Sequence, residues 1–185
     1  MTKAVAGTLR ILLLVSGAAC FPLLLLAQRP SEYQVEAAYL YNFGKFVVWP
    51  SPDRSSGDFD VCILGSDPFG STLDQTISNA TINGKKVAAR RIGKAQDATG
   101  CRIVFLAASE AGRLSSDLGV LNKMGALTVS DLPRFLDRGG MIQFVIEGDK
   151  VRFAVNLSAT QQAGLTLSSE LLKVAIRVVG SAQQP

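Results

Sequence analysis

The chain has no histidine among its 185 residues and only three cysteines. Histidine is the commonest general base and the commonest metal ligand, so its absence removes the usual route to both kinds of site. The sequence also has no Gly-x-Ser-x-Gly elbow, phosphate-binding P-loop or Gly-x-Gly-x-x-Gly fingerprint. We therefore expect a protein without catalytic activity, cofactor or metal.

Charge is nearly absent from the N-terminal part of the chain. Lys3 and Arg10 are the only charged residues before an apolar run from Ile11 to Ala27. A basic start, an apolar middle and a small-residue end form the pattern of a secretory signal. The sequence predicts a signal peptide over residues 1–27, cleaved before Gln28, and a single exported domain over residues 28–185.

Two other interpretations of this segment stay open. The apolar run is about as long as the shortest helix that spans a bilayer, so an uncleaved anchor is one of them, although Pro22 would kink it. Gly17-Ala18-Ala19-Cys20 resembles a lipoprotein cleavage box, but the apolar run continues beyond it. We interpret Cys20 as part of the signal, lost on cleavage.

Export changes how the composition is interpreted. Removal of residues 1–27 leaves 158 residues with 17 basic and 15 acidic side chains, a net charge of +2 instead of +4. A nearly neutral domain gives little reason to expect a nucleic-acid partner. Two cysteines remain, Cys62 and Cys101, and an oxidising compartment favours a disulfide between them over two separate buried thiols.

Helical and strand patterns alternate along the rest of the chain. Helical spacing of apolar residues, with a Ser or Asp cap, predicts helices over residues 31–48, 67–79, 109–124 and 168–179. Short apolar runs predict strands over 59–64, 85–92, 103–106 and 127–129. A hairpin follows, with arms over 141–146 and 151–156 around a Gly-Asp turn.

This order predicts a three-layer α/β domain with helices on both faces of a mostly parallel central sheet and a C-terminal antiparallel β-hairpin at one side. Cys62 lies in one predicted strand and Cys101 lies just before another. Neighbouring strands are about 4.8 Å apart, which brings such residues within the Cα separation of a disulfide. The fold therefore supports the bridge.

Polar residues in and before the hairpin are the candidate binding groups. Arg138 precedes Gly139-Gly140, which permit a bend or a close backbone approach. Arg152 and Asn156 share one face of the second hairpin arm, because side chains four residues apart point the same way in a strand. These three residues could bind an acidic partner or a carboxylate ligand. A solvated strand face is the alternative.

Two further segments have a functional and a structural interpretation. The loop from Gly65 to Gly70 could hold an anion on free N–H groups, although a plain turn in which Asp67 caps a helix fits better. The aromatic residues of the first helix exceed what one face can bury. They would form an exposed patch for homodimerisation or ligand stacking, or be buried on two sides. These residues are Tyr33, Tyr39, Tyr41, Phe43, Phe46 and Trp49.

The residue pattern resembles the YfiR family of periplasmic proteins over nearly the whole predicted mature chain. The longest match is EYQVEAAYLYNFGKFVVWP, from Glu32 to Pro50. Further matches follow in order at residues 62–70, 83–85, 101, 138–142, 151–157 and 164–172. Gly44 stands where an Ala-like residue is expected, at a cost of about 1 kcal/mol in helix stability.

The resemblance implies a periplasmic negative regulator that binds the periplasmic sensor domain of an inner-membrane diguanylate cyclase, or of a similar membrane signalling protein. Such binding lowers cyclic-di-GMP output and biofilm formation. The resemblance also implies the bridge between Cys62 and Cys101. Some members carry a second cysteine pair, which this chain lacks, so we do not expect a redox switch that depends on it.

Two other functions remain as alternatives. One is a periplasmic small-molecule sensor or carrier whose pocket lies at the strand ends. The other is an enzyme that uses carboxylates or a Ser–Lys pair.

Overall fold

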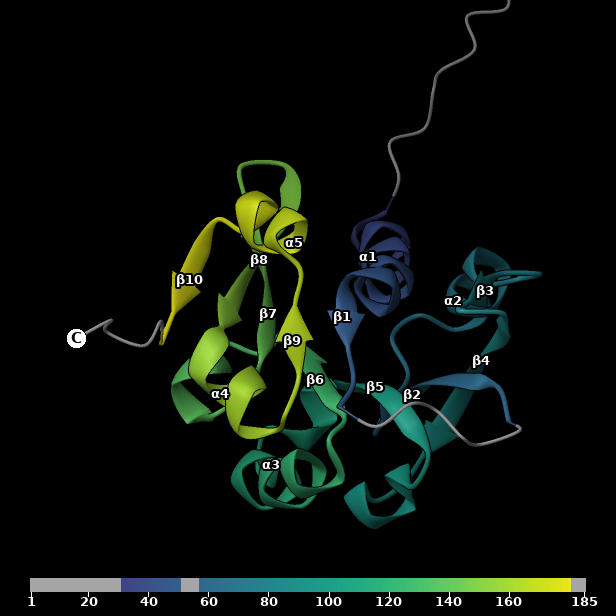
Figure 1. The fold of residues 1–185 in the computed structure, drawn as a ribbon, viewed down its shortest axis with the longest axis horizontal. Coiled ribbons are helices and arrows are strands. Elements are labelled where there is room, and N and C mark those ends of the chain that lie inside the picture. Colours follow the sequence, from purple (N-terminus) through teal and green to yellow (C-terminus); the bar gives the residue numbers. More distant parts are fainter. Residues whose placement is uncertain (1–30, 51–56, 181–185) are drawn as a thin grey trace, which may run out of the picture.

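The computed structural model describes residues 31–50 and 57–180. The predicted signal peptide, Cys20 included, lies outside the described residues. An eight-stranded sheet has the order β10-β8-β7-β6-β5-β2-β4-β3 (Figure 1). Its strands are β2 (Phe59–Leu64), β3 (Thr81–Ile82), β4 (Lys85–Ile92), β5 (Cys101–Leu106), β6 (Leu127–Ser130), β7 (Ile142–Glu147), β8 (Lys150–Asn156) and β10 (Arg177–Val179). A separate small sheet pairs β1 (Val47–Val48) antiparallel with β9 (Thr166–Leu167).

The helices of the described residues are short except for the first. They are α1 (Glu32–Phe46), α2 (Ser71–Thr76), α3 (Leu114–Leu121), α4 (Leu157–Gln162) and α5 (Ser169–Val174). Short 3₁₀ turns occupy Ala95–Ala98, Ala108–Glu110, Asn122–Met124 and Leu136–Arg138. Across residues 31–50 and 57–180, none of these helices has the length and apolar character needed to traverse a bilayer.

Five consecutive strands of the sheet, β4, β2, β5, β6 and β7, are parallel. Numbered 1 to 5 by their order in the chain, these strands lie side by side in the order 2-1-3-4-5, which is the order of a doubly wound, flavodoxin-like sheet. At one edge β3 is antiparallel to β4, and toward the other β8 is antiparallel to β7. The mixed α/β fold with a mostly parallel sheet is therefore as predicted.

Both faces of the sheet are covered, because alternate residues of each strand enter different cores. In β2, Val61 and Ile63 enter the core that includes Leu40 of α1. Cys62 belongs to the opposite core, which α3 covers. The near-continuous apolar runs of β2 and β5 follow from this burial on two sides.

The C-terminal part differs from the prediction in several respects, and α4 and β9 were not predicted at all. The hairpin forms from β7 and β8, but it is not an addition at the sheet edge, since β7 continues the parallel strands and β10 pairs with β8 beyond it. The last helix ends at Val174 instead of Val179, and Arg177–Val179 forms β10. The β-branched residues of this segment favour a strand, and pairing with β8 satisfies its backbone.

Three other helix boundaries were also predicted wrongly. The first helix ends at Phe46, because the β-branched pair Val47–Val48 extends into β1. The second begins at Ser71. Its N-cap is Gly70, three residues after Asp67, the predicted cap. The third begins at Leu114, after a 3₁₀ turn at Ala108–Glu110.

Candidate functional site

Helix α1 places a carboxyl group inside the domain. A capping box fixes the start of the helix: the Ser31 hydroxyl accepts from the Gln34 N–H, and the Gln34 side chain accepts from the Ser31 N–H. Glu36 has no exposed surface, and neither of its carboxyl oxygens has a hydrogen-bond partner within the described residues. The other buried residues of α1 are Ala37, Leu40, Phe43 and Gly44.

A second acidic side chain comes from the loop after β6. The Ser130 hydroxyl donates to the Leu106 carbonyl oxygen at 2.7 Å and accepts from the Leu132 N–H at 3.1 Å. These two bonds fix the chain on both sides of Asp131. The Oδ1 atom of Asp131 is buried and has no hydrogen-bond partner in the part of the chain that the structure describes.

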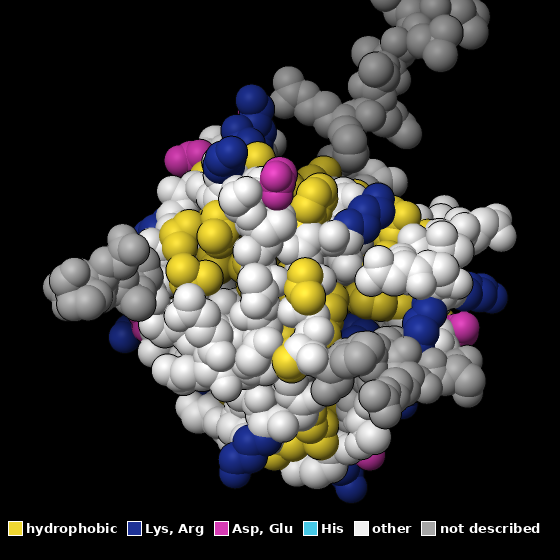
Figure 2. All heavy atoms as spheres, in the orientation of Figure 1, with side chains coloured by type: hydrophobic (Ala, Val, Ile, Leu, Met, Phe, Trp, Pro, Cys, Tyr) yellow, Lys and Arg dark blue, Asp and Glu magenta, His cyan; other side chains and the backbone are white. Residues whose placement is uncertain are grey.

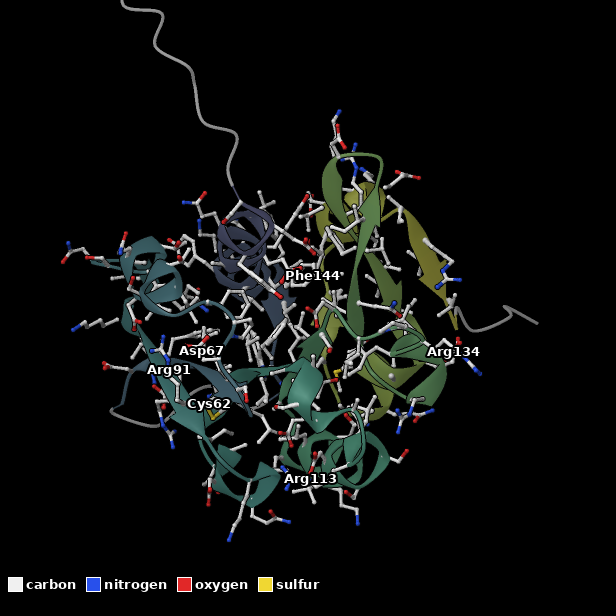
Figure 3. The ribbon with its side chains drawn as sticks, turned by 180° about the vertical axis from the view of Figure 1, so that it is seen from behind. Cys62, Asp67, Arg91, Arg113, Arg134 and Phe144 are labelled. Atoms are coloured by element: carbon white, nitrogen blue, oxygen red, sulfur yellow. A yellow bond between two sulfur atoms is a disulfide. The ribbon has the colours of Figure 1, made fainter. Side chains whose placement is uncertain are left out.

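Glu36 and Asp131 line a pocket of about 240 Å³ between α1 and the carboxyl ends of β6 and β7. Glu32, one turn before Glu36, also lines it. Pairing of β6 with β7 stops at Ser130 and Gln143. The remainder of β7, from Phe144 to Ile146, therefore extends past β6 and forms an apolar wall. Figure 3 shows Phe144 between α1 and the hairpin.

This acidic pocket, defined by Glu32, Glu36 and Asp131, continues into a larger groove. The groove is about 900 Å³, shares Glu32 and Ile146 with the pocket, and runs along the hairpin to Lys150 and Arg152. One end is therefore acidic, whereas the other carries both basic and acidic side chains, Lys150, Arg152 and Asp149.

The electrostatics of the acidic pocket disfavour ionised carboxylates. Burial raises the pKa of Glu36 to about 8, and the negative charges of Asp131 and Glu32 add to this effect. Burial also raises the pKa of Asp131, against a lowering hydrogen bond from its own backbone. Neither Lys nor Arg is among the described residues that line the pocket. Glu36 is therefore protonated at neutral pH in this arrangement.

The predicted disulfide between Cys62 and Cys101 is present in the structure. It joins β2 to its neighbour β5 with a Cα–Cα distance of 5.9 Å. Both cysteines are buried, in the core that α3 covers. The bridge therefore crosslinks the centre of the parallel sheet and lies apart from the acidic pocket.

The crevice between the carboxyl ends of β2 and β5 is where a sheet of this order usually binds a ligand. Here the chain's own side chains occupy it. Ser109 Oγ accepts from the Ser66 N–H at 3.0 Å and donates to Glu110 Oε1 at 3.0 Å, and Glu110 also pairs with Arg113. Gly65, at a φ of +92°, leaves room for them, since a Cβ there would collide with Ser109 and Glu110.

The Gly65–Gly70 loop is a plain turn, but Asp67 does not cap a helix as expected. Its Oδ1 accepts from the Phe69 N–H at 2.8 Å, and its Oδ2 accepts from Arg91 Nε at 2.9 Å (Figure 3). Arg91 also forms an ion pair with Asp74 of α2. Acidic side chains therefore stabilise this loop, and their negative charge disfavours the bound anion that the sequence allowed there.

The three candidate binding residues of the hairpin region do not converge on one site. Asn156 has a structural role: its Oδ1 caps α4 by accepting from the Ala159 N–H at 3.0 Å, and its Nδ2 donates to the Leu136 carbonyl oxygen at 3.2 Å. Arg152 lies four residues away along β8, or roughly 13 Å at the usual rise of a strand, and lines the large groove.

Arg138 points to neither of these places. Its guanidinium donates to the Ala111 carbonyl oxygen at 3.2 Å and to Ser115 Oγ at 3.3 Å, on the α3 side of the domain. The two glycines after it behave as predicted: Gly139 has a φ of +93°, and Gly140 packs against the Phe135 ring. A binding role for Arg138, Arg152 and Asn156 stays a prediction.

Glu36 was missed because the helical spacing assigned to the first helix does not include it; that spacing runs through Val35, Ala38, Tyr39, Asn42, Phe43 and Phe46. Of these residues Phe43 is buried, whereas Phe46 is 38% exposed. Asp131 lies in a loop outside any such pattern. The signal available was the i, i+4, i+7 spacing of Glu36, Leu40 and Phe43, which places an acidic residue on an apolar stripe.

The aromatic residues around α1 are packed mainly inward. The rings of Tyr39 and Phe43 each contact those of Phe144 and Phe153, with centroids 5.1 to 5.9 Å apart. Tyr39 and Phe43 therefore belong to the interior, whereas Phe46 is 38% exposed, and an exposed dimerisation patch in this segment stays a prediction.

The sheet order, the bridge between β2 and β5 and the covering helices define a disulfide-stabilised, doubly wound α/β domain. More particularly, the chain belongs to the YfiR/HmsC-like family, whose sequence pattern matches residues 33–176. The resemblance seen in the sequence is thereby confirmed.

Two solved structures share the fold at low sequence identity. A conserved domain protein from Vibrio cholerae O1 biovar El Tor has a TM-score of 0.57 at 11% identity, over 80% of this chain. The ABC domain in complex with L-Trp from Streptococcus pneumoniae has a TM-score of 0.54 at 12% identity, over 77% of this chain. The match spans 60% of each of these structures. A search of curated proteins finds no match.

Proposed function

We propose that this protein is a periplasmic negative regulator that binds the periplasmic sensor domain of an inner-membrane diguanylate cyclase, or of a similar membrane signalling protein, and lowers cyclic-di-GMP output and biofilm formation. Membership of the YfiR/HmsC-like family over residues 33–176 carries this proposal. The protein acts by binding and has no catalytic activity of its own. Residues 1–27 direct it to the periplasm, where residues 28–185 act as one domain.

Deletion of the gene from its own bacterium tests this function. We expect cellular cyclic-di-GMP, measured by mass spectrometry, to rise several-fold, and surface-attached growth to rise with it. Re-expression of the full chain should restore both, whereas a variant that lacks residues 2–27 should restore neither. Unchanged cyclic-di-GMP in the deletion strain would contradict the proposal.

Physical contact requires a separate measurement. The purified protein should bind the isolated periplasmic domain of a diguanylate cyclase from the same bacterium in a titration calorimeter. The isolated periplasmic domain of an unrelated membrane receptor is the matched control, and equal binding to both would argue against a specific partner.

A small-molecule sensor or carrier is the second candidate, and the groove of about 900 Å³ beside the hairpin favours it. A ligand that binds only the folded protein raises its stability, by about 2.7 kcal/mol at a concentration of 100 Kd. A screen of small metabolites by thermal unfolding therefore separates the two functions. A regulator that acts by protein contact alone should show no such shift.

A homodimer is a further prediction from the sequence. The inward packing of Tyr39 and Phe43 leaves only part of the aromatic segment exposed, notably Phe46. Sedimentation equilibrium of the purified protein would determine whether it forms a dimer.

A further inference from the structure

We propose that the acidic pocket binds an organic cation, with a primary ammonium or guanidinium group seated between the carboxylates of Glu36 and Asp131. This inference rests on the pocket itself and holds whether or not the protein regulates a diguanylate cyclase.

The first argument is that a buried carboxyl group, Glu36, and one buried oxygen of the half-buried Asp131 lack hydrogen-bond partners. Glu36 is 0% exposed, and both of its carboxyl oxygens, together with Asp131 Oδ1, have no hydrogen-bond partner among the described residues. Buried polar atoms in folded proteins are nearly always hydrogen-bonded, because burial without a partner costs free energy. These three oxygen atoms are closed to solvent, so a ligand reaches them only when α1 and the loop after β6 move apart; an ammonium or guanidinium group would then supply N–H donors for all three.

The shape and lining of the pocket suit an organic cation. Its volume of about 240 Å³ can hold a cationic head group and part of an aliphatic stem. Phe144, Val145 and Ile146 offer an apolar wall for that stem. Cations of this kind bury their methylene groups along apolar surface while the charged end is paired.

A metal ion fits the same residues less well. Ca²⁺ takes six to eight oxygen ligands, and no group of three or more His, Cys, Asp or Glu side chains within residues 31–50 and 57–180 is arranged to hold a metal. Two carboxylates and an apolar wall match an ammonium or guanidinium group instead, which needs only a few acceptors on one side.

Binding should be coupled to loss of a proton. Asp131 and Glu32 are the charged groups that act on Glu36, and Tyr33 lies near all three. With a pKa of about 8, Glu36 is mostly protonated at pH 7, whereas a bound cation favours the carboxylate. Affinity should therefore rise from pH 6 to pH 8 and level off above that range.

Titration calorimetry of the periplasmic protein tests the proposal. The probes are n-butylamine, N-butylguanidine and agmatine, with n-butanol and butyrate as neutral and anionic controls. At pH 7 the cations should bind with release of nearly one proton, measured by comparing buffers that differ in ionisation enthalpy. The controls should not bind.

Two substitutions assign the effect to the pocket. Glu36→Gln keeps the shape of the side chain and should lower cation affinity about tenfold or more, while abolishing proton release. Glu147→Gln, the same change at an exposed hairpin residue, should alter neither. Circular dichroism and thermal unfolding verify that both variants are folded.

The two sources of a cation are distinguished by peptide probes. Acetyl-Gly-Arg-Gly-amide and acetyl-Gly-Lys-Gly-amide present the same groups on a protein chain. Binding of the free amines or guanidines indicates a small-molecule ligand, and binding of the peptides alone indicates a basic side chain of a protein. The proposal is overturned if no cationic probe binds at millimolar concentration, if n-butanol binds equally well, or if Glu36→Gln binds as tightly as the wild type.

Discussion

Glu36 should make the stability of the domain depend on pH. The native state keeps its proton up to a pKa of about 8, whereas the unfolded chain releases it near 4.5. Between these values the native state binds more protons, so this group's contribution to the free energy of unfolding falls as pH rises, by at most about 1.4 kcal/mol per pH unit. Above pH 8 the contribution is constant.

Urea unfolding of the wild type and of Glu36→Gln at pH 5.5 and 7.5 measures this contribution. We expect the wild type to lose about 2 kcal/mol more than the variant between the two pH values. Glu147→Gln should behave like the wild type, since its side chain is exposed. Parallel pH profiles for wild type and Glu36→Gln would show that Glu36 is ionised in the native protein.

Gly44 illustrates a second single-residue effect, in which packing outweighs helix propensity. A Cβ at this position of α1 would lie 2.5 Å from Ile82 Cδ1 and 3.0 Å from Phe59 Cζ. Both of these residues are buried, and the Phe59 ring also packs edge-on against Trp49. The glycine allows α1 to approach the sheet closely, which explains its departure from the Ala-like residue expected there.

Gly44→Ala should therefore destabilise the domain. Helix propensity favours alanine by about 1 kcal/mol, but overpacking of a well-filled core costs about 1 to 3 kcal/mol. We expect a net loss of about 1 kcal/mol in urea unfolding. Gly119→Ala is the matched control within α3, where a Cβ would meet nothing within 4 Å, and it should gain up to about 1 kcal/mol. A gain at both positions would refute the packing argument.

At the scale of elements, local pattern predicted the longer strands but missed the short strands β1, β3, β9 and β10. The apolar runs at 59–64 and 103–106 and the hairpin around Gly148 recur in the structure with shifts of one or two residues. These elements depend on alternation and turn residues, which are local properties. Arg177–Val179 was predicted as helix because its pairing with Ala154–Asn156 of β8 is a long-range contact that no local pattern contains.

The candidate site was predicted even less completely, for a related reason. Asn156 was singled out for its place on a strand face. Its side chain instead caps α4 and donates to the Leu136 carbonyl oxygen. These contacts arise only when α4 and the Leu136 turn pack against β8. Glu36 and Asp131 are 95 positions apart in the sequence, and only the folded sheet brings them to one pocket.

The disulfide stabilises the pair of elements that it joins. Cys62 and Cys101 are 39 residues apart, and closing a loop of that length in the unfolded chain stabilises the native state by roughly 4 kcal/mol in the chain-entropy model. The double substitution Cys62→Ala with Cys101→Ala should lower the free energy of unfolding by about that amount. Urea unfolding of the oxidised wild type and the variant measures it, and a loss below about 1 kcal/mol would contradict the entropic account.

At the scale of the whole molecule, alternating strand and helix patterns were sufficient for the fold class but not for the strand order. β4 and β5 lie on opposite sides of β2. This reversal of the strand order sets the position of the switch-point crevice. Ser109 and Glu110 fill that crevice, and the acidic pocket lies instead beyond β6. Fold class alone would have directed attention to the crevice between β2 and β5 and not to the pocket beside β6 and β7.

Export and the disulfide are linked in the whole molecule, because the bridge requires an oxidising compartment. When the full chain is expressed in a Gram-negative host, the periplasmic protein should begin at Gln28, contain no alkylatable thiol, and yield a crosslinked peptide that joins Cys62 to Cys101. A variant that lacks residues 2–27 should stay in the cytoplasm with two reactive thiols and unfold at a lower urea concentration. Intact mass spectrometry with alkylation distinguishes the alternatives: a lipidated Cys20 would appear in the membrane fraction as the first residue, and an uncleaved anchor would retain the mass of the full chain. Either result would overturn cleavage before Gln28 while leaving the bridge intact, since both alternatives still place Cys62 and Cys101 outside the cytoplasm.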